Sequence, residues 1–394
     1  MKPDHTHDDR RKADRRDGST RPDDVLVSAS RRRALALGGA ALTWTAAGCL
    51  DGEEDEPDFD DFLGSTPPGG RPEPEGTSMD ELPDLSGSLV VYSGRGEPLV
   101  GDLMSYIDSL YPDLELTTDY GSSADLSNQI LTEGDDSPAD VFYTVNAGAL
   151  GALSSEGMTT ALTEETLSEV DESFQDPDGE WIGTSGRART VPYNTESLSE
   201  EDVPSDVMEF PGTDAFADSM GWAPTYGSFQ DFVTAMRVLE GREATVDWLE
   251  AMIDLGVSEY SNEQAIANAV ADGEIDAGFA NHYYIQRTLS GDPEAPLATA
   301  FTRDDAGAVF NVAGAAVIEP SQAPETAENF VRHLLSAEAQ EFFAVRTGEY
   351  PLIPGVEPLG DLPTIDELEP PEIDLSELSD VEPTLDILRD VGLL

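Results

Sequence analysis

Short apolar runs alternate with segments of helical periodicity from about residue 86 onward. Residues 89–92 form the first run, and apolar positions spaced three or four apart then continue to residue 110. A second run at 114–120 and a third at 140–143 lie on either side of another helical segment, near 124–133. Because strands that alternate with helices usually form parallel sheets, this pattern predicts an α/β fold.

The alternation continues in the second half of the chain. Residues 191–194 predict a crossover into a second lobe, and the apolar run 309–318 predicts a strand that returns to the first. Residues 325–346 then predict a helix. Within the second lobe the periodicity predicts helices at 229–240, 245–255 and 263–271. One apolar helical face near the end of the chain predicts a terminal helix on the second lobe; it consists of Leu385, Ile387, Leu388 and Val391.

The first 85 residues have a different pattern. Three arginines at 31–33 precede an apolar run at 34–47, which is too short for a comfortable membrane span. This order resembles a twin-arginine export signal, and the residues up to Cys49 resemble a lipobox, in which that cysteine is lipidated. We therefore expect a Tat-like lipoprotein signal at 1–49, with a short uncut membrane anchor as the alternative. Residues 50–85 are rich in Asp, Glu, Pro and Gly, which predicts an acidic flexible tether rather than a binding tail.

Composition narrows the possible partners. The chain has 81 acidic and 21 basic residues among 394, a formal net charge of -60. Acidic residues are spread through the body, which indicates a protein built for high salt, where self-repulsion is screened. No basic face is available to meet phosphates, so we expect no nucleic-acid partner. Cys49 is the only cysteine, which excludes intramolecular disulfides and cysteine metal sites.

The stretch 274–284 carries the most specific chemistry. A predicted strand, Ile275–Ala280, ends at Asn281 and His282 and is followed by two adjacent tyrosines, Tyr283 and Tyr284. In doubly wound sheets the carboxyl ends of strands face the ligand crevice. Phenol oxygens placed there suit a hard cation such as ferric iron. The alternative is that the two tyrosines only form a half-buried strand end.

Four blocks along the chain resemble the ferric-ion-binding proteins, which are solute-binding subunits of iron ABC importers. They occur in the family's order and are Ser137–Tyr143, Ser185–Arg189, Trp222–Phe229 and Asn281–Tyr284. The resemblance, to the haloarchaeal type of these proteins, implies a type II periplasmic-binding-protein fold with two doubly wound α/β lobes joined by a hinge. We expect the first lobe to comprise 86–190 and 312–360, and the second to comprise 191–311 and 361–394.

The resemblance also implies a function, a ligand and a partner. The protein is expected to be a monomer rather than an enzyme, to capture Fe(3+) with a synergistic anion such as carbonate, and to deliver it to an ABC permease. After Tat-like export it is expected at the outer face of the cytoplasmic membrane, anchored by lipid at Cys49.

The family's metal ligands map onto Tyr283 and Tyr284, and some members supply a third tyrosine at the position of Tyr226. Arg95 matches an arginine that meets the synergistic anion in related proteins. Further anion contacts are expected from Gly227, Ser228, Asn146 and Asn281. Arg187 and Arg189 match either an anion contact or a hinge role, with salt bridges to nearby acids as the alternative.

The first-lobe half of the site departs from the family pattern. Gly96 and Glu97 stand where some members use histidine, or histidine and tyrosine, and Glu97 is the available replacement ligand. Val145 stands where some members place a glutamate and cannot ligate a metal. Because this ligand set is incomplete, the chain could instead be a binding protein for an organic anion or a phosphonate, and this alternative stays open. A secreted hydrolase is a third reading, although no nucleophile elbow or zinc-binding histidine pair is present.

Overall fold

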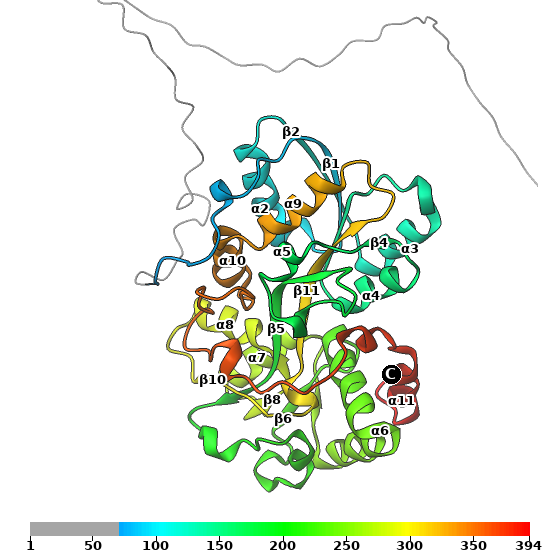
Figure 1. Cartoon of the computed structure of the whole chain (residues 1–394). Coiled ribbons are helices and arrows are strands. Elements are labelled where there is room, and N and C mark those ends of the chain that lie inside the picture. The colour runs from blue at the N-terminus through cyan, green and yellow to red at the C-terminus, as the bar shows by residue number, and fades with distance from the viewer. Residues whose placement is uncertain (1–70) are drawn as a thin grey trace, which may run out of the picture. The chain divides into compact units, whose positions relative to one another are not determined.

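The computed structural model describes residues 71–394, which form two α/β lobes (Figure 1). The predicted signal with Cys49 and the tether up to residue 70 lie outside the described residues. Within 71–394, no helix combines the length and the apolar character that crossing a bilayer requires.

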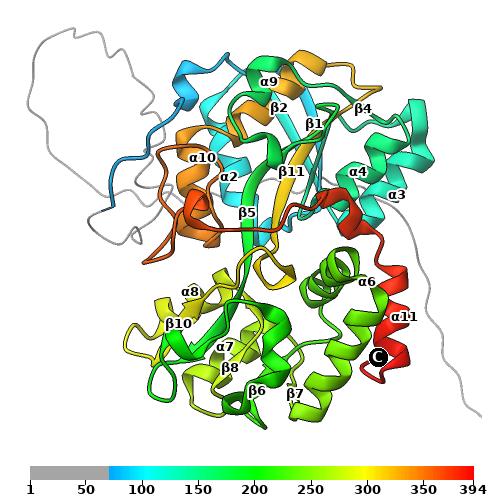
Figure 2. The same cartoon turned by 60° about the horizontal axis from the view of Figure 1, so that its bottom comes forward.

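Lobe 1 is built on three parallel strands. They are β2 (Leu114–Tyr120), β1 (Gly87–Ser93) and β3 (Val141–Thr144), in that order across the sheet. Helices α2 (Glu97–Leu110) and α9 (Pro324–Leu334) lie on one side of this sheet, and α3 (Ser123–Glu133) and α4 (Ala147–Ser155) on the other (Figure 2). The smaller elements are β4 (Thr159–Thr160), α5 (Glu164–Leu167) and α10 (Ala337–Phe342), and α10 runs into a π-helical turn at Phe343–Thr347.

Two long antiparallel strands join the lobes. They are β5 (Ile182–Asn194) and β11 (Phe310–Ile318), which lie side by side through the middle of the molecule (Figure 1). β11 pairs with β3 of lobe 1, and the second half of β5 pairs with strands of lobe 2. The crossover predicted at 191–194 is therefore the end of one continuous strand that begins nine residues earlier, at Ile182.

Lobe 2 consists of short strands and three helices. The strands are β6 (Met220–Trp222), β7 (Ser258–Glu259), β8 (Ala277–Gly278), β9 (Ala280–Asn281) and β10 (Leu297–Ala300). The helices are α6 (Gly227–Leu255), α7 (Glu263–Ala271) and α8 (His282–Gly291). The two helices predicted at 229–240 and 245–255 are the two parts of α6, which Gly241 separates with a non-helical backbone (φ 85°, ψ 162°). Phe232 and Trp248 of α6 pack against each other and against Phe279 in the core of this lobe.

The last part of the predicted tether is not a flexible spacer. From residue 71 onward it lies on lobe 1, where Arg71 forms two hydrogen bonds of 2.8 Å with Glu341 and Met79 is buried. Leu82 and Leu85 are also buried. Burial of these apolar side chains away from water stabilises the docked segment. The acidic composition of residues 50–85 as a whole hid these few apolar positions from the sequence analysis. The flexible tether predicted at 50–85 is thus wrong for residues 71–85.

The C-terminal segment from residue 361 contacts both lobes. Its helix α11 (Glu382–Asp390) packs on α6, where the hydroxyls of Thr234 and Thr384 lie 2.8 Å apart. The preceding 3-10 turn, Leu375–Ser379, lies against α4 of lobe 1 so closely that a Cβ on Gly148 would come within 2.7 Å of Ser379 Cβ. The assignment of the whole segment 361–394 to the second lobe is therefore too simple.

Candidate functional site

Three tyrosine side chains meet in lobe 2. The hydroxyl oxygens of Tyr226 and Tyr284 lie 2.5 Å apart, although 58 positions separate the two residues in the chain. The ring centroids of Tyr283 and Tyr284 are 4.4 Å apart, and those of Tyr226 and Tyr284 are 6.3 Å apart. All three residues that the sequence proposed as phenol ligands therefore belong to one cluster.

Two helix starts bring these phenols together. Tyr226 is the N-cap residue of α6, and Tyr283 and Tyr284 lie in the first turn of α8, whose N-cap is Asn281. The predicted strand at 275–280 is instead two short strands that stop at Asn281. This difference favours the site, because adjacent residues point to opposite faces of a strand but are only about 100° apart around a helix.

Burial keeps Tyr283 and Tyr284 protonated in the free protein. It raises the pKa of Tyr284 far above that of an exposed phenol, and the neighbouring Tyr283 and Tyr226 add to the effect. Burial also raises the pKa of Tyr283, while the positive charge of Arg187 acts in the opposite direction. A phenolate therefore forms here only when a strong positive charge enters the cluster.

Glu263, the first residue of α7, ties the surrounding elements together. Its fully buried carboxylate accepts hydrogen bonds from the Ser228 hydroxyl at 2.6 Å and from the Asn281 backbone N–H at 2.9 Å. It also forms an ion pair with Arg189 of β5. Ser228 and Asn281, which were expected to contact a bound anion, here donate to a carboxylate of the chain itself. No local sequence signal points to Glu263, because a glutamate in the first turn of a helix is common.

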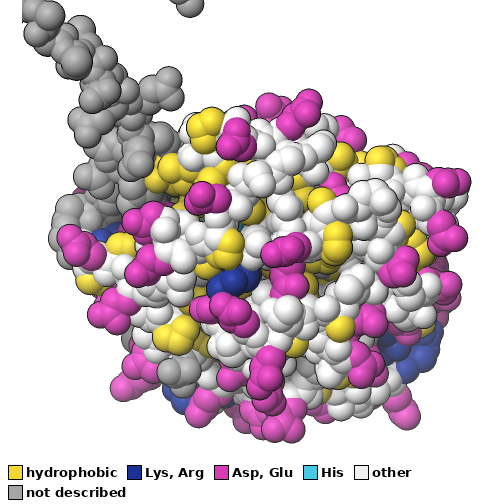
Figure 3. Space-filling view, turned by 45° about the horizontal axis from the view of Figure 1, so that its top comes forward, with side chains coloured by type: hydrophobic (Ala, Val, Ile, Leu, Met, Phe, Trp, Pro, Cys, Tyr) yellow, Lys and Arg dark blue, Asp and Glu magenta, His cyan; other side chains and the backbone are white. Residues whose placement is uncertain are grey.

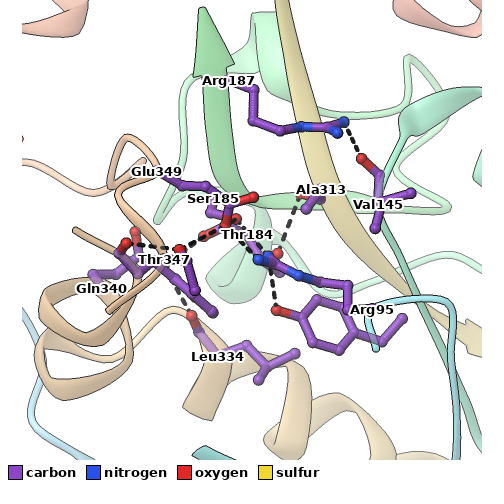
Figure 4. Close-up of polar contacts among 12 residues, drawn as sticks. Arg95, Val145, Thr184, Ser185, Arg187, Ala313, Leu334, Gln340, Thr347 and Glu349 are labelled. Carbon is purple, nitrogen blue, oxygen red and sulfur yellow. Dashed lines mark hydrogen bonds and ion pairs between the residues drawn. The ribbon is translucent and has the colours of Figure 1, made fainter. Parts of the chain in front are cut away.

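Arg95 does not face an open anion site. Its side chain is fully buried and pairs with Glu349, while one guanidinium nitrogen donates to the Ser185 hydroxyl at 2.7 Å and to the Tyr143 hydroxyl at 3.1 Å (Figure 4). Burial opposes ionisation of Glu349, but the charges of Arg95 and Arg187 outweigh it and lower the Glu349 pKa. The predicted anion contact of Arg95 is therefore corrected to a structural ion pair inside lobe 1.

The other first-lobe candidates also have different partners. Glu97 is exposed at the start of α2, in a groove that it shares with Gly101 and Tyr120. Asn146 caps α4 by accepting a hydrogen bond of 3.0 Å from the Ala149 backbone. Gly227 is the exposed first residue of α6. The described contacts of Glu97 and Asn146 do not connect either residue to the phenols, so this half of the predicted site is not assembled.

Arg187 is one of two cations beside the tyrosines, and the other is Arg287, whose Cζ lies 5.5 Å from the ring centroid of Tyr284. Arg187 extends from β5, donates to the Val145 carbonyl of lobe 1, and its charge acts on Tyr283 (Figure 4). His282 is buried against Tyr350, with ring centroids 4.6 Å apart, and its Nδ1 accepts from the Ala188 backbone at 3.2 Å. Burial lowers the pKa of His282 to about 4. Its ring is therefore a neutral part of the hinge packing.

Carboxylate, imidazole and thiol groups do not build a metal site on their own in the described part of the chain. Between residues 71 and 394 no three His, Cys, Asp or Glu side chains are grouped so that they could hold an ion. The three phenols are therefore the donor set that the arrangement offers, and hard trivalent cations are the ions that such oxygens suit.

Comparison with known proteins gives consistent similarities. The pattern of the family described as bacterial extracellular solute-binding protein matches residues 110–368. The major ferric iron-binding protein of Neisseria meningitidis is 34% identical over 273 residues, which cover 68% of this chain and 82% of that protein. The Fe(3+)-binding periplasmic protein of Serratia marcescens is 28% identical, over 78% of this chain and 90% of that protein.

Solved structures agree with the sequence comparisons. Iron-bound HitA from Pseudomonas aeruginosa superposes with a TM-score of 0.68 at 31% identity, covering 78% of this chain and 99% of HitA. A Trichodesmium protein in complex with iron and citrate has the same TM-score at 24% identity, covering 78% of this chain and 100% of that one, which shows a shared fold. These likenesses confirm the predicted α/β periplasmic-binding-protein fold.

Proposed function

The chain belongs to the ferric iron-binding proteins of the bacterial extracellular solute-binding family, and we propose that it captures ferric iron through the phenols of Tyr226, Tyr283 and Tyr284. Proteins of this family bind a solute, so the chain is not an enzyme. Ferric iron is in this account the cargo that the protein carries.

The convergence of the three hydroxyls is the observation that supports this proposal. The 2.5 Å separation of the Tyr226 and Tyr284 oxygens places two donors at one point, and Tyr283 adjoins them. On binding, each phenol releases its proton to solvent and becomes a phenolate. Three phenolates balance the charge of one ferric ion, so the complex adds no net charge to a half-buried site.

The tyrosines also touch the hinge. Gly348 lies so close to Tyr283 that a Cβ on the glycine would come within 3.4 Å of Tyr283 Cβ. The next residue, Glu349, pairs with Arg95, and Tyr350 exchanges backbone hydrogen bonds of 2.7 and 2.8 Å with Gly186 of β5. Iron bound at Tyr283 therefore acts next to a loop that is fixed to lobe 1. We propose that the ion shifts the equilibrium between open and closed lobes through this contact.

Delivery of the iron to an ABC permease completes the proposed role. The twin-arginine pattern and the lone Cys49 support export and a lipid anchor, which would hold a monomeric protein at the outer face of the membrane. Replacing Cys49 with serine should release the protein or leave it as a precursor, and replacing Arg31, Arg32 and Arg33 with lysines should block export. Unchanged fractionation of both variants would remove the lipoprotein proposal.

A titration of the iron-free protein tests the proposed cargo. In molar salt, ferric iron should produce a visible phenolate-to-iron charge-transfer band that saturates at one ion per chain. Calorimetric titrations with a phosphonate and with organic anions should show no comparable binding. Tight binding of such an anion without iron, together with no visible band, would favour the organic-anion or phosphonate alternative.

A further inference from the structure

Resting on the ferric-iron function proposed above, we infer that Glu263 is a co-anion built into the chain, so that iron binding needs no anion from solution at the start of α6. The Glu263 side chain is fully buried, between the hinge strand β5 and the first turns of α6 and α8. It lies beside the phenols without being one of their hydrogen-bond partners.

Glu263 occupies donors of the kind that a dissolved anion would use. Glu263 Oε1 accepts from the Ser228 hydroxyl at 2.6 Å and pairs with Arg189, and Oε2 accepts from the Asn281 backbone at 2.9 Å. A hydroxyl, a guanidinium and a backbone N–H at a helix start are the groups that hold anions in proteins. Here they hold a carboxylate that cannot leave.

The charges around this point are balanced. Arg187 and Arg189 bring two positive charges, and Glu263 and Asp231 bring two negative ones. Burial raises the pKa of Asp231 to about 6, with Glu263 adding to the effect and the two arginines opposing it. Asp231 is therefore charged at neutral pH. A dissolved dianion would meet no excess positive charge, whereas Glu263 and Asp231 both attract a trivalent cation.

Space excludes a second anion as well. The cavity between β5, α6 and β11 has a volume of about 20 Å³. Its polar lining comes from Arg187, Arg189, Ser228, Asp231, Asn281 and Asn311. A water molecule needs roughly 10–15 Å³ of free space, so the cavity has room for one water and not for a carbonate, phosphate or citrate. Three buried donors here have no partner among the described residues, namely Nε of Arg187 and both Nε and Nη2 of Arg189, and one water offers an acceptor to them.

The test compares iron binding with and without added anions. The full chain is loaded with ferric iron in molar NaCl, in buffer free of carbon dioxide and phosphate. The visible band and the rate of iron removal by excess chelator are measured before and after addition of bicarbonate, phosphate or citrate. We expect the unmodified protein to show its full band without any of them, and its removal rate to change less than about twofold, well below the tenfold that ~1.4 kcal/mol of coupling would give.

Two variants sharpen this comparison. Glu263→Gln keeps the shape but loses the charge; it should bind iron at least about tenfold more weakly in anion-free buffer (~1.4 kcal/mol). Because glutamine fills the same space as glutamate, added bicarbonate or phosphate should not restore this binding. Glu274→Gln, at an exposed position of the same lobe, should behave as the unmodified protein.

Each outcome separates the inference from the function on which it rests. If the unmodified protein forms its band only with an added anion, or if Glu263→Gln binds iron unchanged without one, the built-in co-anion is wrong while ferric binding stands. If no band forms under any condition, the proposed function itself fails. If Glu263→Gln does not fold, the anion dependence of the unmodified protein still decides.

Discussion

The hydroxyl oxygens of Tyr226 and Tyr284 lie 2.5 Å apart, at the starts of two different helices of lobe 2. At this distance one hydroxyl donates to the other, and burial raises the pKa of Tyr284 so that it stays protonated. The pair is thus held ready to exchange its protons for a cation that both oxygens can bind.

Proton release should accompany iron binding. The phenols of Tyr283 and Tyr284 have raised pKa values and are protonated at neutral pH in the free protein. Because each phenol must lose a proton, affinity should rise with pH, by about tenfold per pH unit for each proton released. A pH-stat measurement, corrected with a blank for hydrolysis of the iron reagent, should find about three protons per ion. Fewer than one would contradict phenolate binding.

The ion pair of Arg95 with Glu349 should matter for stability and not for iron. Replacing Arg95 with glutamine leaves Glu349 buried without its counter-ion, which typically costs about 3–5 kcal/mol of unfolding free energy. The folded fraction should keep its visible iron band. Arg242→Gln, which removes an exposed pair with Asp390, is the control and should cost at most about 1 kcal/mol. A stable Arg95→Gln protein that loses iron would restore the predicted anion contact.

Local sequence signals found only part of the phenol cluster. Tyr283 and Tyr284 follow a predicted strand, which marks them on their own, whereas Tyr226 was expected only because its loop resembles that of the family. The alternation of apolar runs and helical segments likewise carries the α/β fold. It could not show that β5 is one strand shared by both lobes, since a continuous buried strand looks the same whether it serves one sheet or two.

Contacts that depend on distant partners escaped this reasoning. Glu349 lies 254 positions from Arg95, and no local pattern links them. Glu263 and Glu97 both occupy the first turn of a helix, yet one is fully buried among donors and the other is exposed. Only the packing of α7 against β5 distinguishes them, and this packing is a tertiary property.

Acid should destabilise the protein through its buried histidines. Burial lowers the pKa of His333 and of His282 to about 4. A lowered histidine pKa means that the unfolded chain binds the proton first, so stability is present above pH 6.5 and is lost as pH falls toward 4. The loss is at most about 3 kcal/mol per histidine. His333→Gln removes one of these groups, so the difference in unfolding free energy between this variant and the unmodified protein should be smaller at pH 4 than at pH 7. An equal difference at both pH values would contradict this.

Low salt should also destabilise the protein. The visible surface carries many Asp and Glu side chains and few Arg side chains (Figure 3), and the whole chain has a formal charge of -60. Lowering ionic strength from molar to about 0.01 M extends the Debye length from about 3 Å to about 30 Å, so carboxylates repel over much longer distances. The melting temperature, measured with a chelator present to remove multivalent cations, should fall on dialysis. An unchanged melting temperature would refute salt adaptation.

Ferric titration of single tyrosine variants tests the central claim most directly. Tyr283→Phe and Tyr284→Phe keep the rings but remove the oxygens, and Tyr120→Phe on lobe 1 serves as a matched control. We predict that Tyr283→Phe and Tyr284→Phe both lose the visible band and most of their affinity for ferric iron, while the control titrates like the unmodified protein. A band of full intensity and an unchanged affinity for ferric iron in both of these variants would contradict capture of iron by these phenols.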